Sequence, residues 1–420
     1  MARAGLARVG RGLGWRSLVA GSALALAGAI AVAAAPSADA AGAGAGAAGS
    51  SAAAGAGAAG ALPASGSACG KAVGPFSVSG TWVLRADGEP FISYGLTVPG
   101  LQRPDWGGSV ALDRVKIAAT AKDWCANTVR LQVNQDDLLG PAGTGFNQAY
   151  MTAIKSEVAL AERYQLVVVL NDETNFSPAA NRELGPTPGT EKFWRDLAQV
   201  YGHDPQVIFD LFNEPRMYSV GMSQAQKWHL WLDGGTFGGV RYSFGMAQLA
   251  AYVRNTLGVR NLFWIEGPES SASFAGMVQQ HAVLNVSGVV YALHHPAGQA
   301  DTASWDADFG YLVTTGVAPV VDGEWTNYEP APTAYPTAPR TSCWPGAPNE
   351  VPQFLQYLAE YGIGMNAYQL QPGYLIRSYS NLAGPTTMNA KTWTCQSDQE
   401  TQPGQGAGSQ VLAWFRKQNG

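Results

Sequence analysis

Eight short runs of almost continuously apolar residues recur between residues 91 and 370, and they alternate with longer stretches of helical periodicity. A strand that is apolar on both faces is typical of a parallel sheet covered by crossover helices. Eight repeats of this unit predict an α/β fold in which the sheet closes into a (β/α)8 TIM barrel. The predicted strands are Phe91–Leu96, Thr128–Val133, Leu166–Leu170, Val207–Phe212, Asn261–Ile265, Val289–Leu293, Ala318–Asp322 and Gly364–Leu370.

A doubly wound open sheet is the alternative arrangement of the same elements. The turn Gly95–Gly100 disfavours it, because this segment contains a proline and lacks the glycine pattern of a dinucleotide-binding turn. Ahead of the barrel, Trp82–Leu84 and Phe91–Ile92 flank the turn residues Asp87–Gly88, which predicts a short N-terminal β-hairpin. The predicted helices are Leu112–Trp124, Tyr150–Tyr164, Lys192–Tyr201, Met246–Leu257, Trp305–Thr315, Val351–Tyr361 and Val411–Lys417.

The first 68 residues differ in composition from the rest of the chain. Residues 1–40 resemble a signal peptide, with four arginines, an apolar run from Leu18 to Ala35, and Ala38-Asp39-Ala40 as a small-x-small cleavage site. We therefore expect a secreted, extracellular protein; an uncleaved membrane anchor is the alternative, because the run is close to the shortest length that spans a bilayer. Residues 41–68 are almost entirely Ala, Gly and Ser and predict a flexible linker. The predicted globular domain is residues 69–420.

The charge of the chain argues against polyanionic partners. Its formal net charge is −5, and removal of residues 1–40, with four Arg and one Asp, changes this value to −8. No cluster of Lys or Arg follows the signal, and such a cluster is the usual footprint of proteins that bind nucleic acid or anionic lipid. We expect a neutral ligand, no nucleic acid, no membrane contact after signal cleavage, no cofactor and a monomeric chain.

Four cysteines are an even number in an exported chain, which favours disulfides. Cys69 precedes the hairpin and Cys125 precedes the second strand, so both are expected at the bottom of the barrel and are predicted to pair. Cys343 and Cys395 follow the seventh and eighth strands and are predicted to pair at the top. Metal binding is the alternative, but no Cys-x-x-Cys or paired Cys/His spacing is present.

The carboxyl ends of the predicted strands are unusually polar, and catalytic groups of TIM barrels lie at this edge. The polar groups are Arg130 on the second strand, Asn171, Asp172 and Glu173 after the third, Asn213 and Glu214 after the fourth, Glu266 after the fifth, His294 and His295 after the sixth, and Asp322 and Glu324 on the seventh.

Glu214 and Glu324 form the most informative pair in this set. Cleavage of a glycosidic bond needs one carboxyl group that protonates the leaving oxygen and a second that attacks or screens the anomeric carbon. The two glutamates end opposite strands, so their side chains can converge across the barrel mouth. Asn213 can offer its amide to the sugar 2-hydroxyl, and Arg130 can keep Glu324 ionised. We expect the two carboxyl groups to lie about 5 to 5.5 Å apart, without space for an inverting water.

The chain resembles glycoside hydrolase family 5, the cellulase-type family, over its whole globular part. Phe209–Pro215 matches the most specific motif of that family, Asn127–Leu131 contains its strand-two arginine at Arg130, Ala318–Trp325 resembles its nucleophile strand, and Tyr291–His294 matches the start of its strand-six signature. The resemblance implies that residues 69–420 are a catalytic domain. It further implies a retaining β-glycoside hydrolase acting on a β-linked glucan, mannan or similar glycan, with Glu214 as acid/base and Glu324 as nucleophile.

Three positions depart from the pattern of that family. Pro296 stands where the family usually has a tyrosine that donates to the nucleophile. Asn171 or Asp172 replaces a histidine after the third strand, and Tyr368 replaces a sugar-stacking tryptophan on the eighth. These departures leave both carboxylates in place and concern the first sugar subsites, to which we also assign His294 and Trp325 as supporting residues.

Three alternatives remain. Glu214 could merely favour the N-terminal end of a helix that Pro215 opens. A divalent metal could be held by His294 and His295 with Asp172, Glu173 and Glu266, although adjacent residues of an extended segment point in opposite directions. The chain could also be a non-catalytic carbohydrate-binding or surface-adhesion protein on the same barrel; loss of a catalytic glutamate would mark that class, and both glutamates are present.

Overall fold

The structure is a computed structural model of the chain. It describes residues 69, 71–101, 110–140, 143–174, 184–217, 221–242, 244–295, 301–326, 347–372, 374–389, 394–396 and 407–420. The predicted signal peptide and linker, Pro296 and Cys343 lie outside these residues. Within the described segments, no helix has the length and apolarity that a membrane crossing requires.

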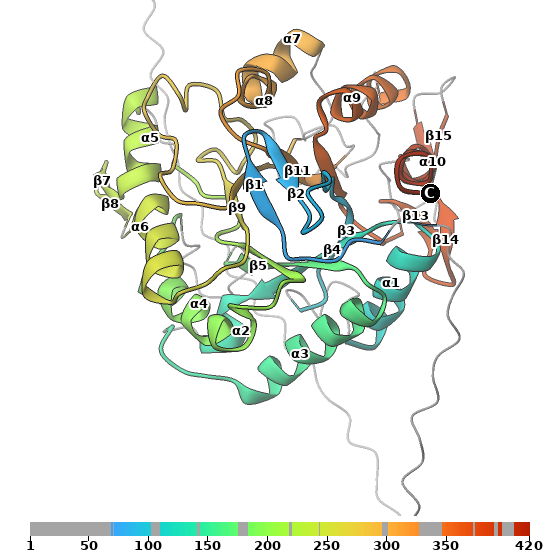
Figure 1. Cartoon of the computed structure of the whole chain (residues 1–420), viewed down its shortest axis with the longest axis horizontal. Coiled ribbons are helices and arrows are strands. Elements are labelled where there is room, and N and C mark those ends of the chain that lie inside the picture. Colours follow the sequence, from blue (N-terminus) through green and yellow to red (C-terminus); the bar gives the residue numbers. More distant parts are fainter. Residues whose placement is uncertain are drawn as a thin grey trace, which may run out of the picture. The chain divides into compact units, whose positions relative to one another are not determined.

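Eight parallel strands form the closed barrel that the sequence predicts (Figure 1). In chain order they are β3 (Tyr94–Val98), β4 (Thr128–Asn134), β5 (Val167–Glu173), β6 (Val207–Asp210), β9 (Phe263–Glu266), β10 (Val289–Leu293), β11 (Val320–Trp325) and β12 (Gly364–Ala367). Each pairs with the next, and β12 closes the barrel by pairing with β3 through Asn366 and Gly95. All eight predicted strands are confirmed.

The helices form a ring around the barrel (Figure 1). They are α1 (Val110–Lys122), α2 (Gln135–Leu139), α3 (Gln148–Arg163), α4 (Pro188–Tyr201), α5 (Gln224–Asp233), α6 (Met246–Ala251), α7 (Thr302–Trp305), α8 (Tyr311–Thr314), α9 (Ala347–Tyr361) and α10 (Gly408–Asn419). Two predicted helices contain a π-helical turn: η1 (Tyr252–Thr256) follows α6, and η2 (Asp306–Gly310) joins α7 to α8.

The helix starts follow from local sequence. Thr187 and Thr190 form a reciprocal capping box at the start of α4, where Pro188 takes one of the first helical positions. Ser223 and Gln226 form the same device at α5, a helix that the apolar pattern did not predict. Three two-stranded sheets were also not predicted: β7 (Gly235–Phe237) with β8 (Val240–Tyr242), β13 (Ile376–Ser378) with β14 (Asn381–Pro385), and β15 (Thr387–Asn389) with β16 (Thr394–Gln396).

An N-terminal hairpin closes the bottom of the barrel. It pairs β1 (Ser77–Ser79) with β2 (Trp82–Leu84), so its turn lies at Gly80. The predicted turn at Asp87–Gly88 also forms. Beyond it, Leu84 bridges Pro90 in antiparallel fashion and the N–H of Phe91 donates to the carbonyl of Val83 (2.8 Å), so the predicted pairing is present as a short bridge beside the β1–β2 hairpin. Figure 1 shows the hairpin lying over the centre of the barrel.

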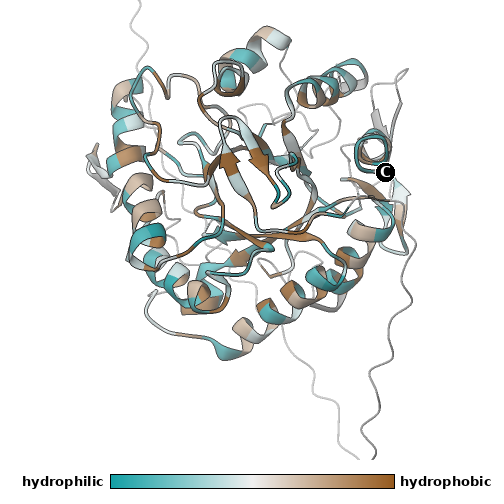
Figure 2. Cartoon of the chain, in the orientation of Figure 1, coloured by the Kyte–Doolittle hydropathy of each residue, from teal (hydrophilic) through white to brown (hydrophobic). Residues whose placement is uncertain are grey.

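The inside of the barrel is apolar at the end beneath the hairpin. Phe76, Val78 and Val83 of the hairpin segment pack against an interior cluster that consists of Ala72, Phe91, Val167, Val169, Ile208, Leu262, Trp264, Val290, Ala292 and Val321. Figure 2 shows hydrophobic residues concentrated on the barrel strands, with hydrophilic residues prominent on the surrounding helices. Because this end is closed by apolar side chains, the polar strand ends are confined to the opposite mouth.

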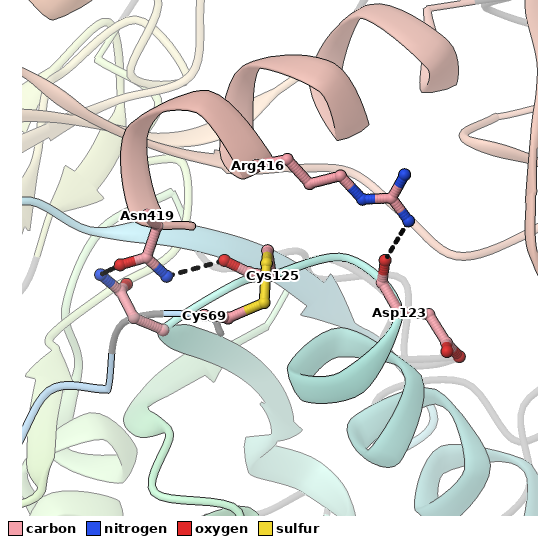
Figure 3. The surroundings of a disulfide bond; sticks show 6 residues. Cys69, Asp123, Cys125, Arg416 and Asn419 are labelled. Carbon is pink, nitrogen blue, oxygen red and sulfur yellow. Dashed lines mark hydrogen bonds between the residues drawn. A yellow bond between two sulfur atoms is a disulfide. The ribbon is translucent and has the colours of Figure 1, made fainter. Parts of the chain in front are cut away.

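The disulfide between Cys69 and Cys125 is present as predicted, with 5.1 Å between the Cα atoms. Around it, the last helix is tied to the loop before β4 (Figure 3): Asn419 donates to the carbonyl of Cys125 (2.7 Å), and Arg416 donates to that of Asp123 (3.2 Å). Both ends of the described domain are thereby fastened to one loop. Since Cys343 lies outside the described residues, the bridge from Cys343 to Cys395 stays a prediction.

Candidate active site

Arg130 lies at the centre of the polar mouth, on β4, with its side chain fully buried. Its Nε donates to Asp210 (2.9 Å) and its Nη1 to Glu324 (2.7 Å). Its Nη2 is shared between Glu266 (3.0 Å) and the side-chain oxygen of Asn213 (2.6 Å). Burial alone would lower the pKa of Arg130, but the three carboxylates outweigh burial and raise the pKa above its ordinary value. The cation is therefore permanent and aligns four side chains from β6, β9 and β11.

An irregularity in β11 directs Glu324 into the mouth. Val321 belongs to the interior cluster, so strict alternation would point Glu324, three residues later, away from the barrel axis. The pairing with β12 shifts register between Asp322 and Trp325, and such a bulge adds one residue and re-aims the side chains that follow it. Glu324 consequently accepts hydrogen bonds from Arg130 and from Gln132 Nε2 (3.1 Å).

Glu214 follows β6 in an unusual backbone conformation. Its φ is +48°, in the left-handed region that side chains other than glycine occupy at a cost of about 1 to 3 kcal/mol. Its backbone N–H donates to Glu266 Oε2 (2.6 Å), which supports this conformation. Its carboxyl group, a quarter exposed, accepts from Arg216 (3.3 Å) and faces the imidazole of His294 (3.4 Å). Glu214 is thus fixed at its main chain and open to the mouth at its carboxyl group.

His294 and His295 point in opposite directions, as the sequence predicts. The Nδ1 of His294 faces Glu214, and its Nε2 lies 3.0 Å from Glu266 Oε1. Burial alone would lower the pKa of His294, but nearby carboxylates, Glu266 foremost, raise it well above its usual value. His295 instead stacks on Phe354 with ring centroids 5.0 Å apart, and burial lowers its pKa to about 4. His294 is therefore a charged side chain at the barrel mouth. His295 is a neutral side chain packed between the barrel and α9.

The two glutamates meet across the mouth. One carboxylate oxygen each from Glu214 and Glu324 and one nitrogen of His294 all lie within 4.8 Å of one another. Among the described residues, these three atoms are also the ones that could surround a cation. The metal site considered from the sequence differs, because it contained His295, Asp172 and Glu173, which do not belong to this cluster. Both nitrogens of His294 face carboxylates, as they do in a protonated imidazolium, so the arrangement suits proton transfer better than metal binding.

Of the positions that depart from the family pattern, those on the third and eighth strands lie on the same edge. Val167 and Val169 face the barrel interior, so alternation directs Asn171 and Glu173 inward and Asp172 toward the helices. Asn171 is fully buried, and Glu173 Oε2 lies 3.4 Å from Gln132. The inward residue at the position of the family histidine is therefore Asn171.

Two predicted supporting aromatic residues differ in their placement. Trp325 is 1% exposed and stacks on Phe354 of α9, so it packs behind β11 and presents no face to a sugar at the mouth. The cause is the same bulge that turns Glu324 inward. Tyr368 directly follows β12 at the mouth end and contacts Tyr374 edge to face, with ring centroids 5.5 Å apart. Its role as a sugar platform stays a prediction.

Asp210, Gln132 and Glu266 belong to the site but were not assigned to it from the sequence. Asp210 lies inside the motif before Glu214; burial, followed by the charge of Glu266, raises its pKa to about 7 although Arg130 opposes them. Gln132 lies two residues after Arg130 and so faces the same side of the strand, a signal that the sequence contains. Glu266 was noted as a polar strand end and a possible metal ligand but was given no part in the glycosidase site, because its contacts depend on three other strands.

A pair of carboxylates across the mouth of a TIM barrel, one of them bound by a buried arginine, defines a TIM-barrel glycoside hydrolase. The model of the family described as Cellulase (glycosyl hydrolase family 5) matches residues 84–373. The chain belongs to this family, as the sequence motifs predicted.

Individual relatives are more distant. Endoglucanase C of Evansella cellulosilytica is 25% identical over 144 residues, which are 32% of this chain and 16% of the relative. A β-glucanase structure from Saccharophagus degradans has a TM-score of 0.54 at 17% identity and covers 83% of this chain and 94% of its own. A β-mannanase structure from Streptomyces thermolilacinus has a TM-score of 0.50 at 16% identity, and the match covers 71% of this chain and 85% of the mannanase chain. At such identities the two structures show a shared fold, and the chain spans only a small part of the length of the curated relative.

Proposed function

We propose that the chain is a secreted, retaining β-glycoside hydrolase that acts by double displacement. The observation that carries this proposal is the approach of Glu214 and Glu324, whose facing atoms lie within 4.8 Å. Retaining glycosidases hold their two carboxyl groups about 5 to 5.5 Å apart, whereas inverting enzymes leave about 6.5 to 9.5 Å for a water molecule. The short separation supports direct attack by one carboxylate.

The surroundings of the two carboxyl groups assign their roles. Glu324 accepts hydrogen bonds from Arg130 and Gln132, which fix its carboxylate at the mouth beside a buried cation. It attacks the anomeric carbon and forms a glycosyl-enzyme. Glu214, beside His294, donates a proton to the leaving oxygen and then removes a proton from the water that hydrolyses the intermediate. No cofactor enters either step.

The substrate in this proposal is a β-linked neutral glycan of the cellulose or mannan type. The β-glucanase of Saccharophagus degradans was solved with cellotetraose and the mannanase of Streptomyces thermolilacinus with mannohexaose. The predicted mature chain has a net charge of −8, which disfavours anionic polysaccharides. We further propose that residues 1–40 direct secretion and that residues 41–68 form a linker, on the composition of these segments alone.

The test is hydrolysis by the mature protein. Reducing ends should be released from a β-1,4-glucan or a β-mannan in a panel that also contains xylan and aryl β-glycosides, and proton NMR of the first product should show the β-anomer. Early formation of the α-anomer would overturn the retaining mechanism, and inactivity on the whole panel would overturn the proposed substrate class.

A further inference from the structure

Glu266 is a buried carboxylate that the proposed reaction does not use. It is the last residue of β9, and its side chain is fully buried, so it has no surface for a sugar. Its Oε1 lies 3.0 Å from both Arg130 Nη2 and His294 Nε2. Its Oε2 accepts the backbone N–H of Glu214 at 2.6 Å. One carboxylate therefore contacts three residues of the mouth that come from three other strands.

The contact with Glu214 supports a strained backbone. A buried N–H without a partner is unfavourable, and here the N–H belongs to a residue with φ of +48°. Glu266 is itself held, because Trp231 Nε1 donates to its backbone carbonyl at 2.8 Å and Arg130 donates to its carboxylate at 3.0 Å. The direction in which the Glu214 side chain leaves the main chain is thus fixed from β9.

The contact with His294 concerns charge. Three carboxylates face the imidazole: Glu266 from β9, Glu214 after β6 and Glu324 from β11. Two further carboxylates lie farther from it, Asp210 on β6 and Asp322 on β11. The nearby cations are Arg130 and Arg216. Of these carboxylates, Glu266 lies nearest the imidazole, 3.0 Å from its Nε2, and Glu214, 3.4 Å from its Nδ1, changes charge during the proposed reaction. Glu266 is therefore the direct contact of the imidazole that takes no part in the proposed proton transfer.

We propose that Glu266 is a positioning residue: it orients the acid/base Glu214 through its main chain and keeps its neighbour His294 protonated, without touching the substrate. This inference rests on the proposed function, because a positioned Glu214 matters for catalysis only if it transfers the proton.

Glu266→Gln tests the inference, since the amide keeps the shape but loses the charge and one acceptor. On substrates with poor leaving groups, kcat should fall by about 10²-fold with little change in KM, because proton transfer is impaired and binding is not. On a dinitrophenyl β-glycoside, whose leaving group needs no proton, kcat of the variant should fall much less. The alkaline limb of the pH profile should move to lower pH. Glu266→Asp keeps the charge and should largely preserve that limb.

A second readout does not depend on activity. The chain has five histidines, so nitrogen NMR of histidine-labelled protein can follow each of them, with a His294→Asn variant to assign the signal. The pKa of His294 should fall by about 1 to 3 pH units in Glu266→Gln. Glu157→Gln is the matched control, because Glu157 is also fully buried but lies on α3, outside the barrel; it should leave the pH profile and the His294 signal unchanged.

The outcomes separate the two claims. If the wild type hydrolyses glycans and Glu266→Gln, folded by circular dichroism, keeps its kcat, pH profile and His294 pKa, the inference is overturned and the proposed function stands. If the wild type hydrolyses none of the panel while Glu266→Gln still lowers the His294 pKa, the contact is supported and the proposed function fails. Should Glu266→Gln not fold, Glu266→Asp with an unchanged kcat on poor leaving groups would overturn the positioning of Glu214.

Discussion

At the scale of single residues, Arg130 connects Glu324 to the rest of the barrel directly, and it reaches Glu214 only through the neighbours Asn213 and Glu266. A buried guanidinium is costly unless its donors are satisfied, and here four side chains satisfy them. Glu324 and Glu214 have different surroundings: Glu324 accepts from the fully buried Arg130, whereas Glu214 accepts from the partly exposed Arg216 and faces His294. This asymmetry predicts different behaviour when each glutamate is removed.

Removal of the proposed nucleophile should stop the reaction. We expect Glu324→Gly to reduce kcat by about 10⁴-fold or more on every substrate, because no group remains to attack the anomeric carbon. Azide, which fits the vacated space, should restore cleavage of an activated aryl β-glycoside and give the α-glycosyl azide. The exposed Glu360→Gln on α9 is the control. Near wild-type hydrolysis by Glu324→Gly, or a β-azide product, would exclude this role.

Removal of the proposed acid/base should depend on the leaving group. We expect Glu214→Ala to lose about 10² to 10⁴-fold in kcat on substrates with poor leaving groups, because they need the proton. Formation of the intermediate from a dinitrophenyl glycoside should be nearly unaffected, and azide should then give the β-glycosyl azide. Measurement of kcat against leaving-group pKa decides the question: an equal loss across the series contradicts the assignment.

At the scale of elements, the disulfide fastens the start of the domain to the loop before β4. We expect replacement of Cys69 and Cys125 by serine to lower the free energy of unfolding by about 2 to 4 kcal/mol, because the bridge restricts the unfolded chain. Urea unfolding of the double variant measures this loss. An unchanged midpoint, or labelling of Cys69 and Cys125 themselves by a thiol reagent in the unreduced wild type, located by peptide mapping, would show that the bridge does not form.

The packing of α3 on α1 predicts a dependence of stability on pH. Burial, with the nearby charge of Asp113, raises the pKa of Glu157 from 4.5 to about 9, and burial raises that of Asp113 to about 6. Between pH 4.5 and 9 the folded state therefore binds more protons than the unfolded state. The free energy of unfolding consequently falls as pH rises from about 5 to 9.

Glu157→Gln should weaken this loss of stability. We expect it to melt at a higher temperature than the wild type at pH 8 and to differ little at pH 4, where the wild-type carboxyl group is protonated in both states. Thermal unfolding at the two pH values measures the effect, with the exposed Glu360→Gln as control. A variant that is less stable than the wild type at pH 8 would contradict the account.

The elements differ in how far the sequence predicts them. The barrel strands were predictable because runs such as Val167–Leu170 are buried on both faces and leave a continuous apolar signal. Helix α5 carries a local signal, the capping box from Ser223 to Gln226, that an apolar pattern alone does not detect. Strands of three residues, such as β7 and β8, are too short to show alternation. The bulge of β11 depends on its partner β12, so the opposite directions of Glu324 and Trp325 could not be predicted.

At the scale of the whole domain, the barrel has two unlike ends. The hairpin fills one end with apolar side chains, and the other end gathers buried charges around Arg130. The pair Glu214 and Glu324 could be predicted because their motifs are local. Glu266 could not, because its meaning depends on contacts with β4, β6 and β10 that only the closed barrel creates.

Double displacement requires that Glu324 forms a covalent bond to the sugar. Incubation of the enzyme with a 2-deoxy-2-fluoro β-glycosyl fluoride, whose fluorine slows hydrolysis of the intermediate, tests for this bond when the label is located by peptide mass spectrometry. We expect one equivalent of sugar on the peptide that contains Glu324, with activity regained as the label is released. A label on Glu214, or hydrolysis of natural substrates with no label on any residue, would contradict it.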